Sequence, residues 1–133
     1  MKESPLNGKN ILVVDDEVEL RKAIIFDLKR RGCKTYEASN GNEAFKIVCE
    51  QNIHIVVSDV RMPESNGVDL LKQIREKYPK IPVVVLATGF ADLTEIEALQ
   101  LGAYALLDKP FDRKKILGLL ENSCSQIENE DAK

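Results

Sequence analysis

Residues 11–17 read ILVVDDE, in which a run of branched apolar side chains ends in three consecutive acids. A run of this length and composition is typical of a β-strand. Four further strand-like runs follow along the chain, at residues 34–38, 53–58, 83–87 and 105–107. Three of the five runs are almost continuous Val, Ile and Leu, which is typical of parallel strands buried on both faces. The sequence therefore predicts a sheet with helices on both sides.

The segments between these runs carry apolar residues three and four positions apart, which is the spacing of an amphipathic helix. Gly32 and Gly102 follow two of these segments as C-terminal stops, and Pro79 closes another. Crossover connections between parallel strands are right-handed, and 133 residues are too few for an eight-stranded barrel. We therefore predict a doubly wound, flavodoxin-like α/β fold, with five helices and a five-stranded parallel sheet in the order 2-1-3-4-5.

The composition excludes several classes of protein. The net charge is −3 and the excess of acidic residues falls at the C-terminal end, so we expect no basic face that binds nucleic acid. The chain has no tryptophan and therefore few aromatic rings on which bases could stack. Three widely spaced cysteines and one His argue against a zinc site and fit a reducing, cytoplasmic setting. The most apolar run, residues 81–87, is too short to span a bilayer, so we expect no membrane association.

The ends of the predicted strands carry the polar residues that point to a function. In a sheet of this order strands 1 and 3 are neighbours, so Asp15 and Asp16 are expected to meet Asp59, with Thr88 and Lys109 on the opposite wall. Three close carboxylates repel one another unless their pKa values rise or a cation lies between them. An all-oxygen cluster suits Mg²⁺, and a carboxylate beside this ion can attack phosphorus. The sequence therefore predicts a Mg²⁺ site that receives a phosphoryl group.

Four segments resemble the signature motifs of the receiver domain of two-component response regulators. They are VVDDE at 13–17, SDVRMPESNG at 58–67, LATG at 86–89 and LLDKPF at 106–111. They occur in the order of the family and at the ends of the predicted strands.

The resemblance covers residues 9–121, nearly the whole chain. We accordingly expect an N-terminal extension over residues 1–8 and a receiver domain over residues 9–121. Residues 122–133 are polar and lack helical periodicity, and we expect them to form a frayed tail.

The resemblance also implies a role for each matching acid. Asp59 would be the phosphoacceptor. Mg²⁺ would be bound by Asp16, Asp59 and the backbone carbonyl of Arg61, while Asp15 would hold the ion through a water molecule. The phosphoryl donor would be a phosphohistidine on a sensor histidine kinase or a phosphotransfer protein, and the signal would pass to a downstream protein target.

The remaining motif residues imply how the signal is switched. Thr88 would be the switch hydroxyl, and Lys109 would pair with the phosphate, ahead of a cis Lys-Pro bond. The family usually carries an aromatic residue three positions before this lysine, whereas this chain has Leu106. Arg61 and Phe90 occupy two positions that tune the lifetime of the phosphoryl group, and neither can orient an attacking water. We therefore expect slow self-dephosphorylation, with Phe90 shielding the acyl phosphate, and output through the face formed by helix 4, strand 5 and helix 5.

Several alternatives remain open at this point. The chain is either a stand-alone regulator or a receiver excised from a longer one, since nothing in its length provides an output domain. A phosphorylation-independent interaction module would keep the fold without the chemistry. A flavodoxin-like FMN carrier would need Gly, Ser or Thr after strand 1, where this chain has acids. A phosphatase with an aspartyl nucleophile would need a second acid to protonate the leaving group, and no candidate stands out.

Overall fold

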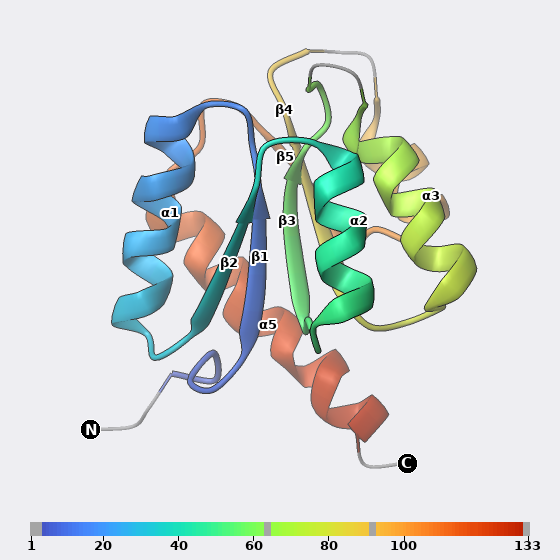
Figure 1. Ribbon diagram of the computed structural model, residues 1–133. Coiled ribbons are helices and arrows are strands. Elements are labelled where there is room, and N and C mark those ends of the chain that lie inside the picture. The colour runs from blue at the N-terminus through green and yellow to red at the C-terminus, as the bar shows by residue number, and fades with distance from the viewer. Residues whose placement is uncertain (1–3, 63–64, 91–92, 132–133) are drawn as a thin grey trace.

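A computed structural model describes residues 4–62, 65–90 and 93–131 of the chain. Residues 63–64 of the second motif and the outermost residues of both predicted extensions, 1–3 and 132–133, lie outside the described part. Within it, five parallel strands form one sheet in the order β2-β1-β3-β4-β5 (Figure 1), which confirms the predicted order. The strands are β1 Asn10–Val14, β2 Lys34–Ala38, β3 Ile55–Asp59, β4 Val83–Thr88 and β5 Ala105–Asp108.

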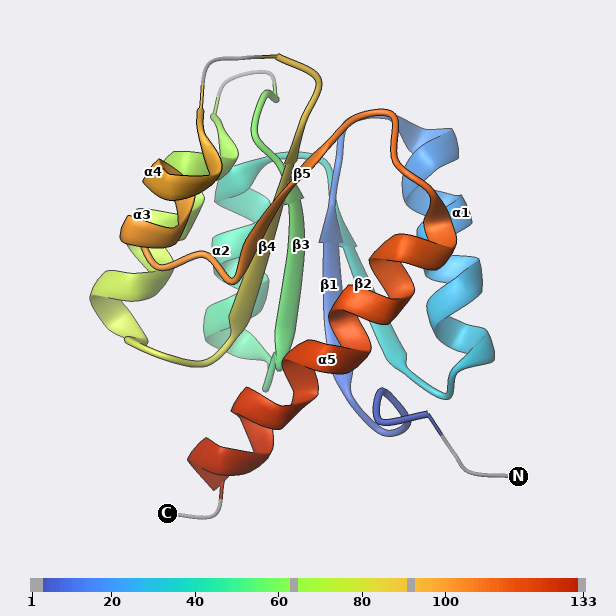
Figure 2. The same cartoon turned by 180° about the vertical axis from the view of Figure 1, so that it is seen from behind.

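Five helices cover the two faces of the sheet in the described part of the chain. They are α1 Val18–Arg30, α2 Gly41–Glu50, α3 Gly67–Lys77, α4 Glu95–Gln100 and α5 Arg113–Asp131. α1 and α5 lie together on one face, and the other three lie on the opposite face, as Figure 2 shows from behind. A bilayer-spanning helix is missing from the residues that the structure describes.

Alternate residues of the central strands build two separate cores. Val57 and Val85 pack toward α1 and α5, whereas Val56 and Val84 pack toward the helices on the other face. Every residue of β3 and β4 is buried. This burial on both faces explains the continuous apolar runs, because neither side of these strands meets solvent. The edge strand β2 is more exposed and is correspondingly more polar.

Local sequence signals fix where the helices begin. The side chains of Asn40 and Asn66 accept hydrogen bonds from the backbone N–H groups of Glu43 and Asp69, at 2.9 and 2.8 Å, and so cap α2 and α3. Thr94 forms a reciprocal capping box with Glu97 at the start of α4.

The C-terminal helix is longer than the sequence analysis expected. α5 continues to Asp131, so the expectation of a frayed tail from residue 122 is wrong for the described residues. Ser123, Cys124 and Ile127 are buried, and the latter two join the core formed with α1. Leu6, in the predicted N-terminal extension, is fully buried in the same core, and the Ser4 hydroxyl donates a hydrogen bond to Glu121. The helix continues because these contacts offset its polar composition. The division of the chain at residue 121 stays a prediction.

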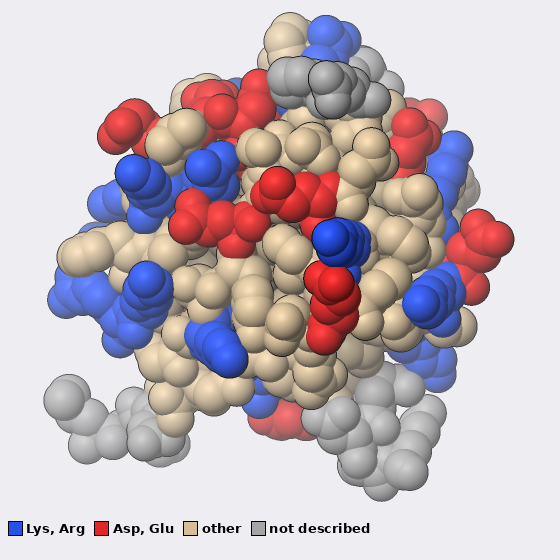
Figure 3. All heavy atoms as spheres, in the orientation of Figure 1, with Lys and Arg blue, Asp and Glu red and all other residues tan. Residues whose placement is uncertain are grey.

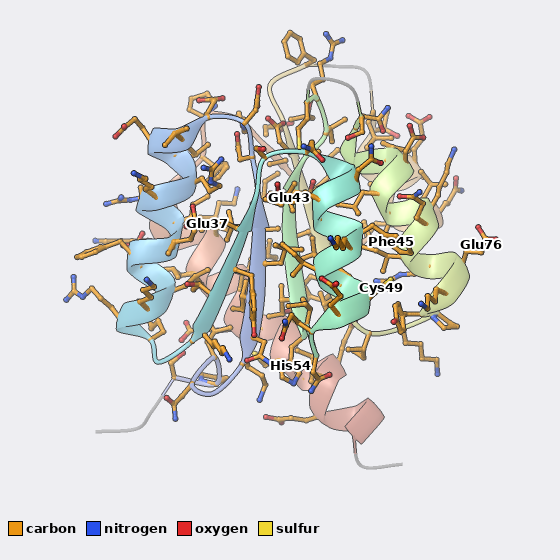
Figure 4. The ribbon with its side chains drawn as sticks, in the orientation of Figure 1. Glu37, Glu43, Phe45, Cys49, His54 and Glu76 are labelled. Atoms are coloured by element: carbon orange, nitrogen blue, oxygen red, sulfur yellow. The ribbon has the colours of Figure 1, made fainter. Side chains whose placement is uncertain are left out.

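The two ends of the sheet carry different parts of the chain. The strands point toward one end, where the loops that follow them gather, whereas both chain termini lie at the other end (Figures 1 and 2). His54 lies at that other end, just before β3 (Figure 4), and its Nδ1 accepts a hydrogen bond from the backbone N–H of Asn10 at 2.9 Å. On the face seen in Figure 3, basic side chains gather over α1, and acidic and basic side chains are interspersed elsewhere.

Candidate functional site

A pocket of about 720 Å³ lies at the carboxyl ends of β1, β3 and β5. Strand register explains its position, because Val14 pairs with Ser58 and Asp59 with Ala87, which brings the loops after these strands to one edge. The pocket has charged walls and apolar walls. Its lining residues are Asp16, Glu17, Asp59, Arg61 and Lys109, together with Leu20, Met62, Gly89, Phe90, Pro110 and Phe111.

Lys109 lies at the centre of the charged part of the site. Its Nζ is 3.0 Å from Asp15 Oδ2, 3.0 Å from Asp59 Oδ2 and 3.3 Å from Glu17 Oε1. Burial alone would lower the pKa of Lys109, but the hydrogen bonds to Asp59 and Asp15 outweigh burial and raise the pKa well above its usual range. The ammonium group is therefore a permanent positive charge beside these carboxylates. The sequence analysis expected Lys109 on the opposite wall, and the structure places it among the acids.

Asp59 ends β3 and is only 8% exposed. Burial raises the pKa of its carboxyl group from 3.8, and the nearby charge of Asp15 acts in the same direction. Hydrogen bonds from Lys109 and from the backbone of Arg61 oppose this rise. The carboxylate is thus poorly solvated but paired with Lys109, at the end of a buried strand.

Ser58 and Gly67, the first residue of α3, lie against the backbone of Asp59. The Ser58 hydroxyl donates to the backbone carbonyl of Asp59 at 3.0 Å, and Gly67 N–H donates to the carbonyl of Val60 at 2.8 Å. A Cβ added to Gly67 would collide with the carbonyl oxygen of Asp59. Glycine at the end of the SDVRMPESNG motif is therefore a steric requirement of the site.

Asp15 is buried and rigidly placed. Its Oδ1 accepts a hydrogen bond from the backbone N–H of Glu17 at 2.8 Å, and its carbonyl accepts one from Arg21 Nη1 at 2.7 Å. Glu17, not Asp15, is the N-cap residue of α1, and no side chain caps that helix. Asp15 is therefore not the N-cap of α1, and its position is set by the hydrogen bonds with Glu17 and Arg21.

The acids that converge differ in part from those expected. Carboxylate oxygens of Asp15, Glu17 and Asp59 lie within 4.8 Å of one another, whereas Asp16 lines the pocket outside this cluster. Glu17 is 64% exposed and stands at the rim. Sequence reasoning overlooked Glu17, although it belongs to the same VVDDE motif. All the donors are hard oxygen atoms, which fits Mg²⁺ better than a transition metal.

Thr88, Phe90 and Arg61 form the far side of the pocket. The buried Thr88 hydroxyl accepts a hydrogen bond from Phe90 N–H at 3.1 Å and donates one to the Phe90 carbonyl at 3.4 Å. The Arg61 guanidinium lies 3.8 Å from the centroid of the Phe90 ring, a cation–π contact. Sequence reasoning singled out all three residues but gave no sign of this contact. Leu106 packs against the core on the α2–α4 side of the sheet.

The family model of the response regulator receiver domain matches residues 11–121. The chain belongs to this family. The receiver domain is 35% identical over 119 residues to the DNA-binding transcriptional regulator NtrC of Proteus hauseri, which covers 87% of this chain and 24% of that protein. The chain thus spans about a quarter of the length of the curated relatives that it matches.

Solved structures resemble the receiver domain closely. A receiver domain protein from Clostridium thermocellum superposes with a TM-score of 0.83 at 31% identity, over 90% of this chain and 97% of the other. A response regulator protein from Burkholderia pseudomallei, solved with a phosphorylated aspartic acid, a calcium ion and citrate, has a TM-score of 0.76 at 28% identity, over 93% and 73% of the two chains. Family membership sets aside the flavin-carrier alternative.

Proposed function

We propose that Asp59 accepts a phosphoryl group from a phosphohistidine on a sensor kinase or phosphotransfer protein. The observation that carries this proposal is the placement of a buried carboxylate at the mouth of an open pocket, 3.0 Å from the ammonium group of Lys109. A buried carboxylate with a raised pKa and a specific charged partner in a pocket is typical of a functional site. The phosphorylated aspartic acid in the Burkholderia protein supports the same chemistry.

In the proposed reaction a carboxylate oxygen of Asp59 attacks the phosphorus atom. The new P–O bond forms as the P–N bond to the donor imidazole breaks, and the imidazole leaves with the electron pair of that bond. Lys109 keeps Asp59 ionised before the attack and pairs with a phosphoryl oxygen after it. The Thr88 hydroxyl would donate to a second oxygen, for which it must give up the hydrogen bond that it donates to the Phe90 carbonyl.

The residues of the site fit Mg²⁺, which when bound would neutralise charge on the transferred phosphoryl group. We propose Asp16, Asp59 and the carbonyl of Arg61 as its ligands, with Asp15 acting through a water molecule. Glu17 adds a carboxylate at the rim of the same cluster. Without a bound metal ion the ammonium group of Lys109, within 3.3 Å of carboxylate oxygens of Asp15, Glu17 and Asp59, compensates part of their charge.

We propose that output passes through the face formed by α4, β5 and α5 to a protein target in the cytoplasm. Ile96 and Leu99 are large apolar residues of α4 whose side chains are exposed. The three cysteines are free thiols, which fits a reducing compartment. The proposed phosphoryl transfer to Asp59 is the same whether the receiver domain acts alone or within a longer regulator.

Phosphoryl loss is proposed to be slow, because neither Arg61 nor Phe90 can orient a water for attack on the acyl phosphate. Phe90→Ala should speed the release of inorganic phosphate from the loaded protein, by removing the ring that shields the pocket. A time course of phosphate release measures this rate. A wild-type rate as fast as that of the variant would contradict the shielding role.

The proposed function is tested by intact-mass measurement after incubation with acetyl phosphate, with and without Mg²⁺. The wild-type protein should gain one phosphoryl group only with the metal, and Asp59→Ala should gain none. Asp69→Ala, which removes an exposed acid from the first turn of α3, is the matched control and should behave as wild type. Equal gain in wild type and Asp59→Ala would overturn the proposal.

A further inference from the structure

Phe90 connects the phosphoacceptor loop to the switch hydroxyl through two separate contacts. Its ring carries the guanidinium of Arg61 at 3.8 Å, and its backbone forms both hydrogen bonds with Thr88. The backbone of Arg61 in turn bonds the carboxylate of Asp59. A continuous chain of contacts thus runs from Asp59 through Arg61 and Phe90 to Thr88.

We propose that the cation–π stack of Arg61 on Phe90, named the latch here, keeps the Thr88 hydroxyl turned toward Phe90 in the unphosphorylated protein. When Asp59 is phosphorylated, the Arg61 and Phe90 side chains separate and the Thr88 hydroxyl turns away from Phe90. This inference rests on the proposed function, since phosphorylation is what opens the latch. Arg61 and Phe90 are positioning residues in this scheme, because they act through the hydroxyl of Thr88. The aromatic group that reports phosphorylation is then Phe90, whereas Leu106 offers no ring for that purpose.

The electrostatics favour release of the latch. A phosphoryl group adds roughly two negative charges and three acceptor oxygens, two residues away from Arg61. Phe90 is 55% exposed, so its ring gives the guanidinium a weak, partly hydrated contact. A charge-assisted hydrogen bond from an arginine to phosphate is stronger than an exposed cation–π contact. The same phosphoryl group competes for the hydrogen that Thr88 donates to the Phe90 carbonyl, so this hydrogen bond and the ring contact with Arg61 are lost together.

A simpler view is that the stack only covers part of the Phe90 ring and has no influence on Thr88. The two views differ in the unphosphorylated protein. If the stack is a latch, removing the guanidinium shifts Thr88 toward its phosphorylated arrangement without any phosphoryl group. If the stack only shields part of the Phe90 ring from solvent, the Thr88 side chain keeps its orientation when Arg61 is replaced.

The chain contains no tryptophan, so Phe90→Trp places a single tryptophan in the stack, and excitation at the long-wavelength edge of its absorption selects it over the tyrosines. In this variant, quenching of the indole by acrylamide should rise about twofold on phosphorylation with acetyl phosphate and Mg²⁺, as one ring face loses its covering guanidinium. Phe26→Trp is the matched control, since Phe26 is also exposed, at 59%, and also lies near an arginine, with Arg30 at 5.8 Å. Its quenching should not change on phosphorylation.

A second measurement follows the methyl resonance of Thr88 in otherwise unsubstituted protein. In unphosphorylated Arg61→Met this resonance should move part of the way to its phosphorylated position. Unchanged Thr88 resonance in Arg61→Met would overturn the latch, as would unchanged Phe90→Trp quenching in a sample whose intact mass shows the phosphoryl group. Absence of any mass gain in the wild type would instead overturn the proposed function, while the Arg61→Met comparison still decides whether the stack controls Thr88.

Discussion

Asp59 lies in an environment unlike that of an ordinary surface acid, because it is buried beside Lys109 and Asp15. Because burial raises its pKa above 3.8, the folded protein binds a proton at Asp59 more tightly than the unfolded chain does. The stability that this proton contributes is present at low pH and is lost as pH rises through the folded-state pKa. Asp59→Asn cannot titrate, so the wild type should lose free energy of unfolding relative to this variant as pH rises above about 4.

Urea unfolding of both proteins across this pH range measures the difference. Each comparison uses the same buffer without divalent cations, because a bound metal would add its own linkage to the folded state. Parallel stability curves for wild type and Asp59→Asn would contradict the perturbed carboxyl group.

Gly67 offers a second test at the residue scale. Gly67→Ala should lower the free energy of unfolding by about 1–3 kcal/mol, because its Cβ would collide with the backbone carbonyl of Asp59. Phosphoryl uptake from acetyl phosphate should fall as Asp59 is displaced. Gly118→Ala, inside α5 with no atom within 4 Å of the added Cβ, should raise stability by about 0.5–1 kcal/mol and leave uptake unchanged. Equal effects of the two substitutions would rule out the steric role.

The site residues differ in how far the sequence could predict them. Asp15, Asp59, Thr88 and Lys109 follow strand runs, so the topology alone predicted their edge of the sheet. The side-chain arrangement within that edge was not predictable, because it depends on rotamers and loop paths that no periodicity records. The central position of Lys109 among the acids is the main example.

At the scale of elements, α5 shows why local polarity misleads. Residues 122–131 are mostly polar, which suggested a frayed end. However, Cys124, four residues after Leu120, and Ile127, three residues after Cys124, continue the buried side of the helix. Leu6 from the other end of the chain lies in the same core. Two apolar residues in a polar stretch are only a weak indication of a helix. The contact with Leu6, which is distant in sequence, could not be predicted from the residues of the helix.

Ile127→Ala measures what this extension contributes. It should lower the free energy of unfolding by about 2–5 kcal/mol, since Ile127 is fully buried in the core with α1. Gln126→Ala, one position earlier on the exposed side, should change it by less than about 0.5 kcal/mol. Chemical denaturation of the two variants decides the matter, and similar small values for both would mean that the last turns of α5 do not pack.

At the scale of the whole molecule, the fold was the most predictable property. Continuous apolar runs predicted strands buried on both faces, and right-handed crossovers in a chain of this length indicated an open, doubly wound sheet. The strand order typical of the five-stranded form of that fold is the order that the structure has. This order brings the ends of β1 and β3 together and separates the pocket from both chain termini (Figures 1 and 2).

The central claim is that Asp59 is the carboxylate that receives the phosphoryl group. Borohydride reduction of the protein after treatment with acetyl phosphate and Mg²⁺ converts an acyl phosphate to an alcohol, and peptide mass mapping then locates the modified residue. The proposed function predicts homoserine at position 59 alone, and none without the metal. Reduction at position 15 or 16, or an unmodified position 59 in protein that has gained a phosphoryl group, would contradict it.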